Sequence, residues 1–313
     1  MKYLSSIILF FSISILTHAQ SIPELGDVDW LRSYDEAVGE SEATGKPIFI
    51  LFQEVPGCAT CVNYGQNVLT DPLLVDAIEH EFIPLAIYNN KGGADKKILD
   101  KYNEPTWNNP VVRIVDANGK DLTSRIAGDY SISGVAAGMQ SALLVADNDR
   151  PEYLDLLKAE QANNLETTYY SMYCFWSGEA AFGDKQGVVA TEPGWMSGKE
   201  VVKITYDPTA VSDKELDNVA SRNQCSPIKE AKGYRIDKDP QYYLKQSRYK
   251  YLPLSLTQKT RINAALKNGD NPASFLSPSQ QTYLDQVNSS DKEHDVLYDM
   301  AFAEAWRKMV AKI

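Results

Sequence analysis

Four cysteines carry most of the chemistry that this sequence can perform. Cys58 and Cys61 form a Cys-x-x-Cys pair in GCATC, Cys174 stands alone in YCFW, and Cys225 follows in RNQC. The thiolate is the nucleophilic form of cysteine, and it is favoured where a cysteine begins a helix, because free backbone N–H groups and the helix dipole favour negative charge. The residues around Cys58 and Cys174 predict such a position for both.

The Cys-x-x-Cys pair follows a strand and opens a helix. The run KPIFILF (46–52) is apolar and predicts a buried strand. Cys58 then lies at the N-terminus of the next helix, and Cys61 lies one turn further, within reach of a disulfide. This arrangement predicts redox chemistry. Half of a metal site or an inert pair is the alternative, but the sequence has no second close cysteine pair and its three histidines form no cluster. We therefore expect no metal.

Alternating strands and helices predict an α/β fold for residues 28–149. Strands are expected at 46–52, 82–88 and 110–116, and helices at 61–80, 94–102 and 133–146. Asn118-Gly119 predicts a hairpin turn after the third strand, because these residues tolerate positive φ. The expected order is β-α-β-α-β-β-α.

This segment resembles the thioredoxin superfamily. The stretch GKPIFILF…GCATC…LTDPLLVDAIEHEFIPLAIY is similar to exported thioredoxin-like modules. The resemblance implies that Pro110, in NNPVVRIV, is a cis-proline that faces the dithiol. Gly57 and Ala59-Thr60 replace the usual Trp before the first cysteine and the usual Gly-Pro between the two, so the resemblance leaves the redox potential undetermined.

Cys174 lies at a second junction of strand and helix. TTYYSMY (167–173) is rich in β-branched and aromatic residues and predicts a strand, and FWSGEAAFG predicts the first turns of a helix. Phe175 and Trp176 could form an apolar cup for a methyl group, since sulfur contacts with aromatic rings are worth about 0.3–1.5 kcal/mol. A buried structural cysteine beside core aromatics is the alternative.

Glu200 begins a strand, EVVKITYDP (200–208), whose residues alternate between apolar and polar. It shares the apolar face with Val202, Ile204 and Tyr206. Desolvation on that face would favour the protonated carboxyl, which a general acid requires. The alternative is that Glu200, as the first residue of the strand, points into solvent.

Cys225 follows a helix that the capping-box pattern SDKE (212–215) predicts to end near Arg222. It would then lie in a flexible loop from which a second thiol can reach Cys174.

The second half resembles peptide methionine sulfoxide reductase A. CFWSGEAAF is similar to that family's GCFWGxExxF, GKEVVKITYDPTAVSDKEL to its GHAEVVxVxYDPxxISYEELL, and YRIDKDPQYYLKQ to its YxAExYHQxYL. The resemblance implies that Cys174 is the nucleophile, that Phe175 and Trp176 bind the methyl group, and that Glu200 donates a proton to the sulfoxide oxygen. It further implies that Cys225 resolves the oxidised Cys174 and that the S epimer is reduced.

The sequence departs from this family in the loop between its motifs. Only 26 positions (200 − 174) separate Cys174 from Glu200, and the longer loop that carries a substrate-binding tyrosine is missing. Tyr173 and Ser177 replace two glycines of the first motif. Trp195, Tyr234 or Tyr242 are the aromatic residues that could compensate.

Composition and the first residues favour an exported protein. Residues 1–19 have one lysine, an apolar core and a small residue, Ala19, at the end, which predicts a cleaved signal peptide rather than a membrane anchor. The net charge of −11 becomes −12 when Lys2 is removed, and an acidic protein of this kind is a poor partner for nucleic acid or anionic membrane. We expect periplasmic or secreted localisation and no membrane span after cleavage.

We expect an N-terminal thioredoxin-like fold followed by a methionine sulfoxide reductase A-like two-layer α/β domain, that is, an α/β and α+β chain. The expected parts are the signal peptide (1–19), the thioredoxin-like domain (28–149), a linker helix (150–166), the reductase-like domain (167–290) and an amphipathic helical tail (291–313). Val296, Met300, Phe302 and Trp306 of the tail are expected to dock on the second domain.

Three functions remain open from the sequence. The first is reduction of methionine sulfoxide in oxidised peptides or proteins, with Cys58 and Cys61 regenerating Cys174, with an external thiol/disulfide reductant and without a cofactor. The second is a thiol-disulfide oxidoreductase or isomerase in which the second domain only binds clients. The third is a structural protein with a static Cys174–Cys225 bridge.

Overall fold

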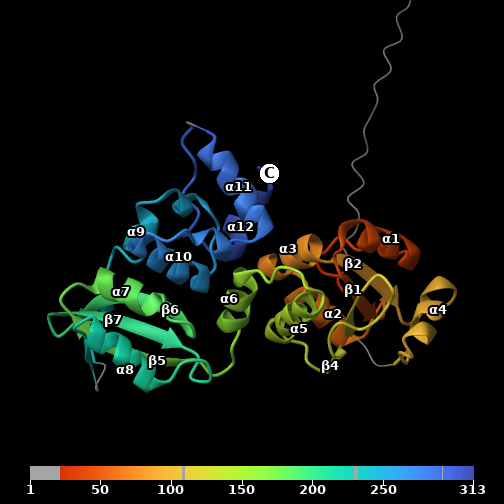
Figure 1. Cartoon of the computed structure of the whole chain (residues 1–313), viewed down its shortest axis with the longest axis horizontal. Coiled ribbons are helices and arrows are strands. Elements are labelled where there is room, and N and C mark those ends of the chain that lie inside the picture. Colours follow the sequence, from red (N-terminus) through yellow and green to blue (C-terminus); the bar gives the residue numbers. More distant parts are fainter. Residues whose placement is uncertain (1–21, 108–109, 229–231, 291) are drawn as a thin grey trace, which may run out of the picture.

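The computed structural model describes residues 22–107, 110–228, 232–290 and 292–313. It contains two bodies, each built on its own sheet, with a group of helices between and above them (Figure 1). The expected signal peptide and Asp291 lie outside the described residues. Among the described helices, none combines the length and the apolar character that a membrane crossing requires.

The first body is a sheet covered by helices on both faces. Its strands lie in the order β2-β1-β3-β4, with β1 and β2 parallel and β3 antiparallel to β1 and to β4. All six residues of β1 are buried, because α1 and α4 pack on one face while α2, α3 and α5 pack on the other. The elements are α1 (Tyr34–Thr44), β1 (Ile48–Gln53), α2 (Ala59–Asn67), α3 (Pro72–Glu81), β2 (Ile83–Tyr88), α4 (Ala94–Lys101), β3 (Val111–Val115), β4 (Ile126–Ala127) and α5 (Ile132–Val145).

This arrangement confirms the expected mixed α/β fold, with two corrections. Helix α1 precedes β1, whereas the expected order began with a strand. The single helix expected over 61–80 is two helices, because Pro72 begins a new one and the Asp71 side chain accepts a hydrogen bond from the Leu74 backbone N–H at 3.0 Å. Such a cap satisfies one of the free donors at a helix start. The turn after β3 is also present, with Gly119 at φ 80°.

The second body is an antiparallel sheet covered on one face by α7 and α8. Its strand order is β8-β5-β7-β6-β9. Val202, Ile204 and Tyr206 of β7 are buried against those two helices, as the alternation predicts. The elements are β5 (Glu166–Met172), α7 (Phe175–Gly183), β6 (Val188–Met196), β7 (Lys199–Tyr206), α8 (Asp213–Arg222), β8 (Ser226–Pro227) and β9 (Arg235–Ile236).

A cluster of helices follows the second sheet and includes the C-terminal segment. It comprises α9 (Tyr242–Lys245), η1 (Arg248–Tyr251), α10 (Leu256–Asn268), η2 (Pro272–Phe275), α11 (Pro278–Asn288) and α12 (Phe302–Val310). The expected tail helix over 291–313 is wrong in its first part, because the described helix begins only at Phe302. Leu297 and Tyr298 lie in a coil and a turn, and their backbone N–H groups donate to the Lys250 carbonyl. Phe302 packs on the core of the first body and not on the second domain, and Trp306 contacts both the first body and the helical cluster. Val296 stays exposed.

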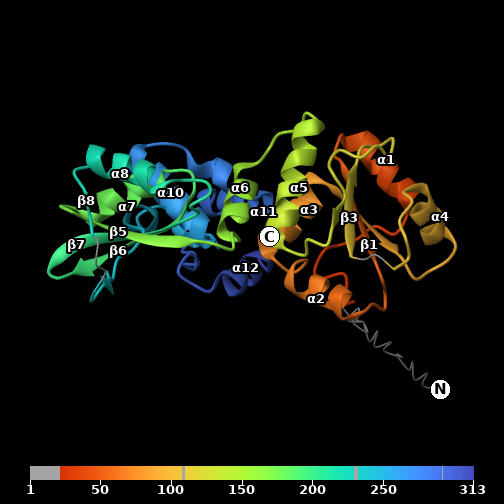
Figure 2. The same ribbon diagram turned by 90° about the horizontal axis from the view of Figure 1, so that it is seen from below.

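Helix α6 (Glu152–Glu160) lies between the two bodies (Figures 1 and 2). Tyr153, Leu154 and Leu157 are buried in the core of the first body, whereas Leu156 is buried in the helical cluster. The sequence predicts this helix as a linker, and the structure shows that it is also a packing element with two buried faces.

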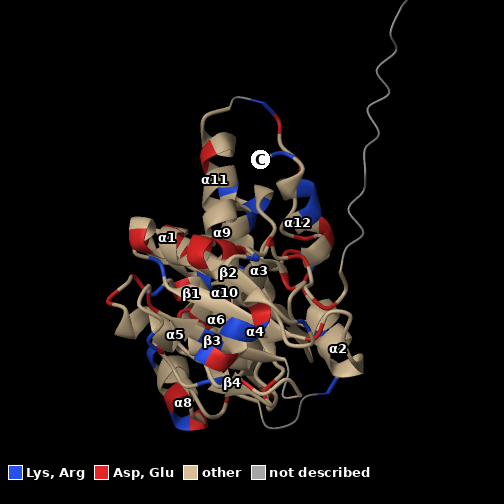
Figure 3. Ribbon diagram, turned by 90° about the vertical axis from the view of Figure 1, so that its right-hand side faces the viewer, with Lys and Arg blue, Asp and Glu red and all other residues tan. Residues whose placement is uncertain are grey.

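Polar contacts add to this junction. The Glu160 carboxylate accepts hydrogen bonds from Ser255 and from the backbone of Thr257 at the start of α10, at 2.6 and 3.0 Å. The Ser279 hydroxyl of α11 donates to Asp76 of α3 at 2.5 Å. Both acidic and basic residues occur on α4, α8 and α12, as Figure 3 shows.

Candidate functional site

The dithiol lies at the start of α2. Cys58 is the N-cap residue and is exposed, Cys61 is fully buried, and the two sulfur atoms are 3.4 Å apart as free thiols. A hydrogen bond from the Cys61 backbone lowers the pKa of Cys58, whereas burial raises the pKa of Cys61 to about 11. Cys58 is therefore the more easily ionised and the more accessible of the two thiols, whereas Cys61 stays protonated near neutral pH.

Glu54 supplies a carboxylate at this dithiol. One of its oxygens and the two sulfur atoms all lie within 4.8 Å of one another. The geometry suits proton transfer from Cys61. The same three atoms could hold a soft cation, although structural zinc sites use four protein ligands. Glu54 could not be predicted as a site residue from the sequence, because a glutamate after a buried strand belongs to no motif.

Gly57 leaves no space for a side chain. A Cβ atom there would lie 2.4 Å from the Glu54 carbonyl oxygen and 2.7 Å from the Cys61 Cβ. The Gly57 backbone N–H donates to the carboxylate of Glu24 at 2.6 Å, and Gln53 donates to the Cys61 carbonyl at 3.1 Å. These contacts explain why glycine precedes the first cysteine here.

Pro110 is buried at the start of β3. The peptide bond before it involves residue 109, so the expected cis bond lies outside the described residues. The described cis X–Pro bond is Val55–Pro56, just before the dithiol.

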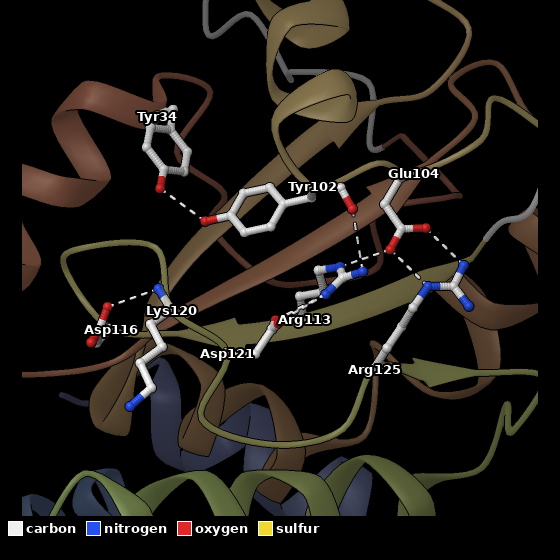
Figure 4. Close-up of polar contacts among 8 residues, drawn as sticks. All are labelled: Tyr34, Tyr102, Glu104, Arg113, Asp116, Lys120, Asp121 and Arg125. Carbon is white, nitrogen blue, oxygen red and sulfur yellow. Dashed lines mark hydrogen bonds and ion pairs between the residues drawn. The ribbon is translucent and has the colours of Figure 1, made fainter.

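A buried ion network holds the segment between α4 and β3. The Glu104 carboxylate, whose side chain is 1% exposed, accepts hydrogen bonds at 2.7 Å from Arg113 and from Arg125 (Figure 4). Burial alone would raise the pKa of Glu104, but the hydrogen bonds from Arg125 and Arg113 hold it below the ordinary value. The network fixes the two ends of the segment that leads to Pro110.

Cys174 is the N-cap residue of α7 and is half-buried. The neighbouring backbone N–H, that of Phe175, donates to the carboxylate of Glu200 at 2.7 Å. Glu200 pairs with Met172 on one side and with Trp195 on the other, because β7 lies between β5 and β6. The structure therefore brings the predicted nucleophile and the predicted acid to one place.

Aromatic rings surround this junction. Phe175 contacts Trp176 and Trp195 edge to face, with ring centroids 5.5 and 5.4 Å apart. Trp176 also stacks on Tyr242 at 4.3 Å with an interplanar angle of 21°. Tyr173, beside the cysteine, is 98% exposed. Three aromatic residues could replace the substrate-binding tyrosine of the missing loop. Of these, Trp195 and Tyr242 contact the rings beside Cys174, whereas Tyr234 packs on Tyr169.

Cys225 lies in the coil between α8 and β8 but is not in an open loop. It is 9% exposed and packs in the core of the second body, and this burial raises its pKa. Ser226, the next residue, pairs with Ser171 of β5. Cys225 therefore approaches the end of β5 from the side opposite to Glu200, and both it and Cys174 are free thiols.

The structure does not bring the two thiol centres together. Helices α2 and α7, which begin at Cys58 and Cys174, lie in different bodies and stay apart in both views (Figures 1 and 2). Each centre thus has its own surroundings.

The sheet order of the first body, with a Cys-x-x-Cys pair at the start of α2, is a thioredoxin-like arrangement. Residues 29–117 match the family model described as Thioredoxin-like. Among solved structures, the chain is similar to one titled DsbH Oxidoreductase, with 19% identity and a TM-score of 0.33, over 40% of this chain and 91% of that chain.

The chain is also similar to methionine sulfoxide reductases over short stretches. It is 32% identical over 90 residues to peptide methionine sulfoxide reductase MsrA of Methanococcus maripaludis, covering 23% of this chain and 57% of that protein. It is 36% identical over 63 residues to peptide methionine sulfoxide reductase of Drosophila melanogaster, covering 16% of this chain and 26% of that protein. It is 35% identical over 74 residues to peptide methionine sulfoxide reductase MsrA of Geobacter metallireducens, covering 18% of this chain and 46% of that protein. The chain thus spans about half or less of the length of these relatives.

Proposed function

We propose that this protein reduces methionine sulfoxide in peptides or proteins at Cys174. The observation that carries the proposal is the 2.7 Å hydrogen bond from the Phe175 backbone N–H to Glu200, which holds a carboxyl group beside the cysteine that begins α7. The aromatic cluster next to them offers an apolar site for a methyl group. The similarity to named methionine sulfoxide reductases supports the same chemistry.

The reaction proceeds in balanced steps. Cys174 attacks the sulfoxide sulfur while Glu200 delivers a proton to its oxygen, so the sulfoxide leaves as the thioether and Cys174 becomes a sulfenic acid. Cys225 then condenses with the sulfenic acid, which releases water and forms a disulfide. Exchange with Cys58, followed by attack of Cys61, returns both thiols to the reduced state and leaves the dithiol oxidised. An external thiol reductant completes the cycle.

Cys225 must move for the second step. Its buried position and raised pKa favour the neutral thiol. A shift of the coil between α8 and β8 would expose it to the sulfenic acid. We infer S-epimer selectivity from the resemblance alone, export from the signal-peptide pattern of residues 1–19, and the domain limits at residues 28–149 and 167–290 from the sequence pattern and the resemblance together.

A single-turnover experiment tests the proposal. The prereduced protein is mixed with a peptide that contains methionine sulfoxide, and product and thiol loss are followed for the wild type and for Cys174→Ser. Product that forms with loss of thiols in the wild type and is absent in the variant supports the proposal. Equal product from the variant refutes it.

A second function, thiol-disulfide exchange on client proteins, is favoured by the dithiol itself. An exposed Cys58 with a lowered pKa beside a buried Cys61 is an arrangement suited to that reaction. Reduction of insulin that is lost in Cys58→Ser and kept in Cys174→Ser would support it.

A further inference from the structure

One short segment, Asp237–Tyr242, contacts both tryptophans of the Cys174 site. The Asp237 carboxylate accepts a hydrogen bond from the indole N–H of Trp195 at 2.9 Å. The Asp239 carbonyl accepts one from the indole N–H of Trp176 at 3.2 Å. Tyr242 then stacks on Trp176. The segment therefore fixes the planes of two rings that come from different elements, α7 and β6.

A buried carboxyl group holds this segment. Glu179 of α7 is 0% exposed, and its two oxygens lie 3.0 and 3.2 Å from the backbone nitrogen of Gln241, which donates to them. Gln241 has a left-handed backbone, φ 55°, and its side chain donates to the Thr191 carbonyl at 3.2 Å. A non-glycine residue keeps such a conformation only where the surroundings enforce it. Burial raises the pKa of Glu179 to about 8.

No role in the proposed reaction explains a buried carboxyl at this place. Glu179 belongs to α7, one turn beyond Phe175 and Trp176, and its partner is the backbone of the residue before Tyr242. Its contacts thus tie the helix that begins at Cys174 to the loop that orients the rings.

We propose that the segment Asp237–Tyr242 is the specificity-determining loop of the Cys174 site, that it sets Trp176 and Trp195 as the walls of a box for a methylsulfinyl group, and that Glu179 is the positioning residue that holds it. This inference rests on the proposed function and extends it to a substrate class.

The box selects by size and by surface. Aromatic walls fixed by hydrogen bonds cannot separate to admit a larger alkyl group, and contacts between sulfur and aromatic rings favour a thioether or sulfoxide over a charged side chain. A methyl group therefore enters, and an ethyl group is disfavoured.

The test compares methionine sulfoxide with ethionine sulfoxide in the same peptide. Tyr242→Leu removes the stack on Trp176, and Glu179→Gln removes the ionisable group but keeps an acceptor for the Gln241 N–H. Tyr169→Leu, on the opposite face of the same sheet, is the matched control for loss of a partly exposed tyrosine. KM, the single-turnover rate at saturation and the methyl-to-ethyl preference are measured for each.

We expect Tyr242→Leu to raise KM about 3- to 10-fold, the effect of one aromatic contact, and to reduce the methyl preference, with little change in the saturated rate. The control should change neither quantity. A methyl preference in Tyr242→Leu equal to that of the wild type would overturn the inference, while product formation by the wild type would leave the proposed function intact.

Failure of the proposed function gives a different result. Peptides with methionine and with ethionine are titrated into Cys174→Ser, and into the same variant with Tyr242→Leu, while tryptophan fluorescence is followed. Saturable binding with a methyl preference that Tyr242→Leu weakens supports the loop even if the wild type forms no product. Binding that is absent, or insensitive to both changes, refutes it.

Discussion

Replacement of Glu179 by glutamine should change how stability depends on pH. The carboxyl group is fully buried in α7, and burial raises its pKa from 4.5 to about 8, against the smaller opposing effect of hydrogen bonds from the backbone of Gln241 and Tyr242. Glutamine has nearly the same shape and keeps an oxygen that accepts the Gln241 N–H, but it does not titrate.

Proton linkage determines whether stability rises or falls with pH. In the unfolded chain Glu179 ionises near pH 4.5, whereas in the folded chain it stays neutral up to about pH 8. The folded state therefore binds more protons between these values, so the contribution of Glu179 to stability is fully present below pH 4.5 and is lost as the pH rises through 8. The difference between an ordinary pKa of 4.5 and one of about 8 corresponds to roughly 5 kcal/mol as an upper limit.

Urea denaturation of the wild type and of Glu179→Gln at pH 4.5, 6, 7 and 9, chosen to span both values, measures this effect. The free energy of unfolding of the wild type, relative to the variant, should fall by several kcal/mol across this range, because every other titrating group is common to both proteins. Parallel curves would refute the assignment of a neutral, buried carboxyl at this position.

Three further predictions concern other parts of the chain. Glu54→Gln should slow insulin reduction by about 10²-fold while alkylation of Cys58 keeps its rate, since the carboxylate acts on Cys61; an equal loss in both assays would contradict this. Glu104→Gln should cost about 3 kcal/mol of unfolding free energy at pH 7, and because the pKa of Glu104 is lowered, the difference should shrink as the pH falls below 4.5; denaturation at both pH values checks this. A mixture of Cys174→Ser with Cys58→Ser, each inactive alone in multiple turnover, should recover turnover that rises with concentration, because the two centres lie apart in one molecule; turnover that stays absent would mean that transfer occurs within one chain.

Much of the first body could be predicted from local patterns. The apolar runs that become β1, β2 and β3 are long and uninterrupted, and Cys58 follows the first of them directly, so its place at a helix start was predictable. The break between α2 and α3 depends on a single proline after a capping aspartate, which the helical pattern of 61–80 conceals.

The Cys174 site was predictable only in part. The strand over 167–173, the junction of strand and helix at Cys174 and the apolar-polar alternation of 200–208 are all visible in the sequence. Together they place Phe175 near Glu200, to whose carboxylate its backbone N–H donates. The contacts of Glu179 with Gln241 cross 62 positions of the chain and depend on a left-handed backbone at glutamine, which no local pattern indicates. The buried state of Cys225 likewise depends on the packing of α7, α8 and the sheet together.

The two buried faces of α6 bear on how this molecule unfolds. Tyr153, Leu154 and Leu157 complete one hydrophobic core while Leu156, in the same turn, belongs to another. Melting of this helix would expose apolar surface in the first body and in the helical cluster at once. Trp306 of α12 also packs against both of these cores. The chain should therefore lose its structure in one cooperative transition, with one calorimetric peak, despite having two sheets.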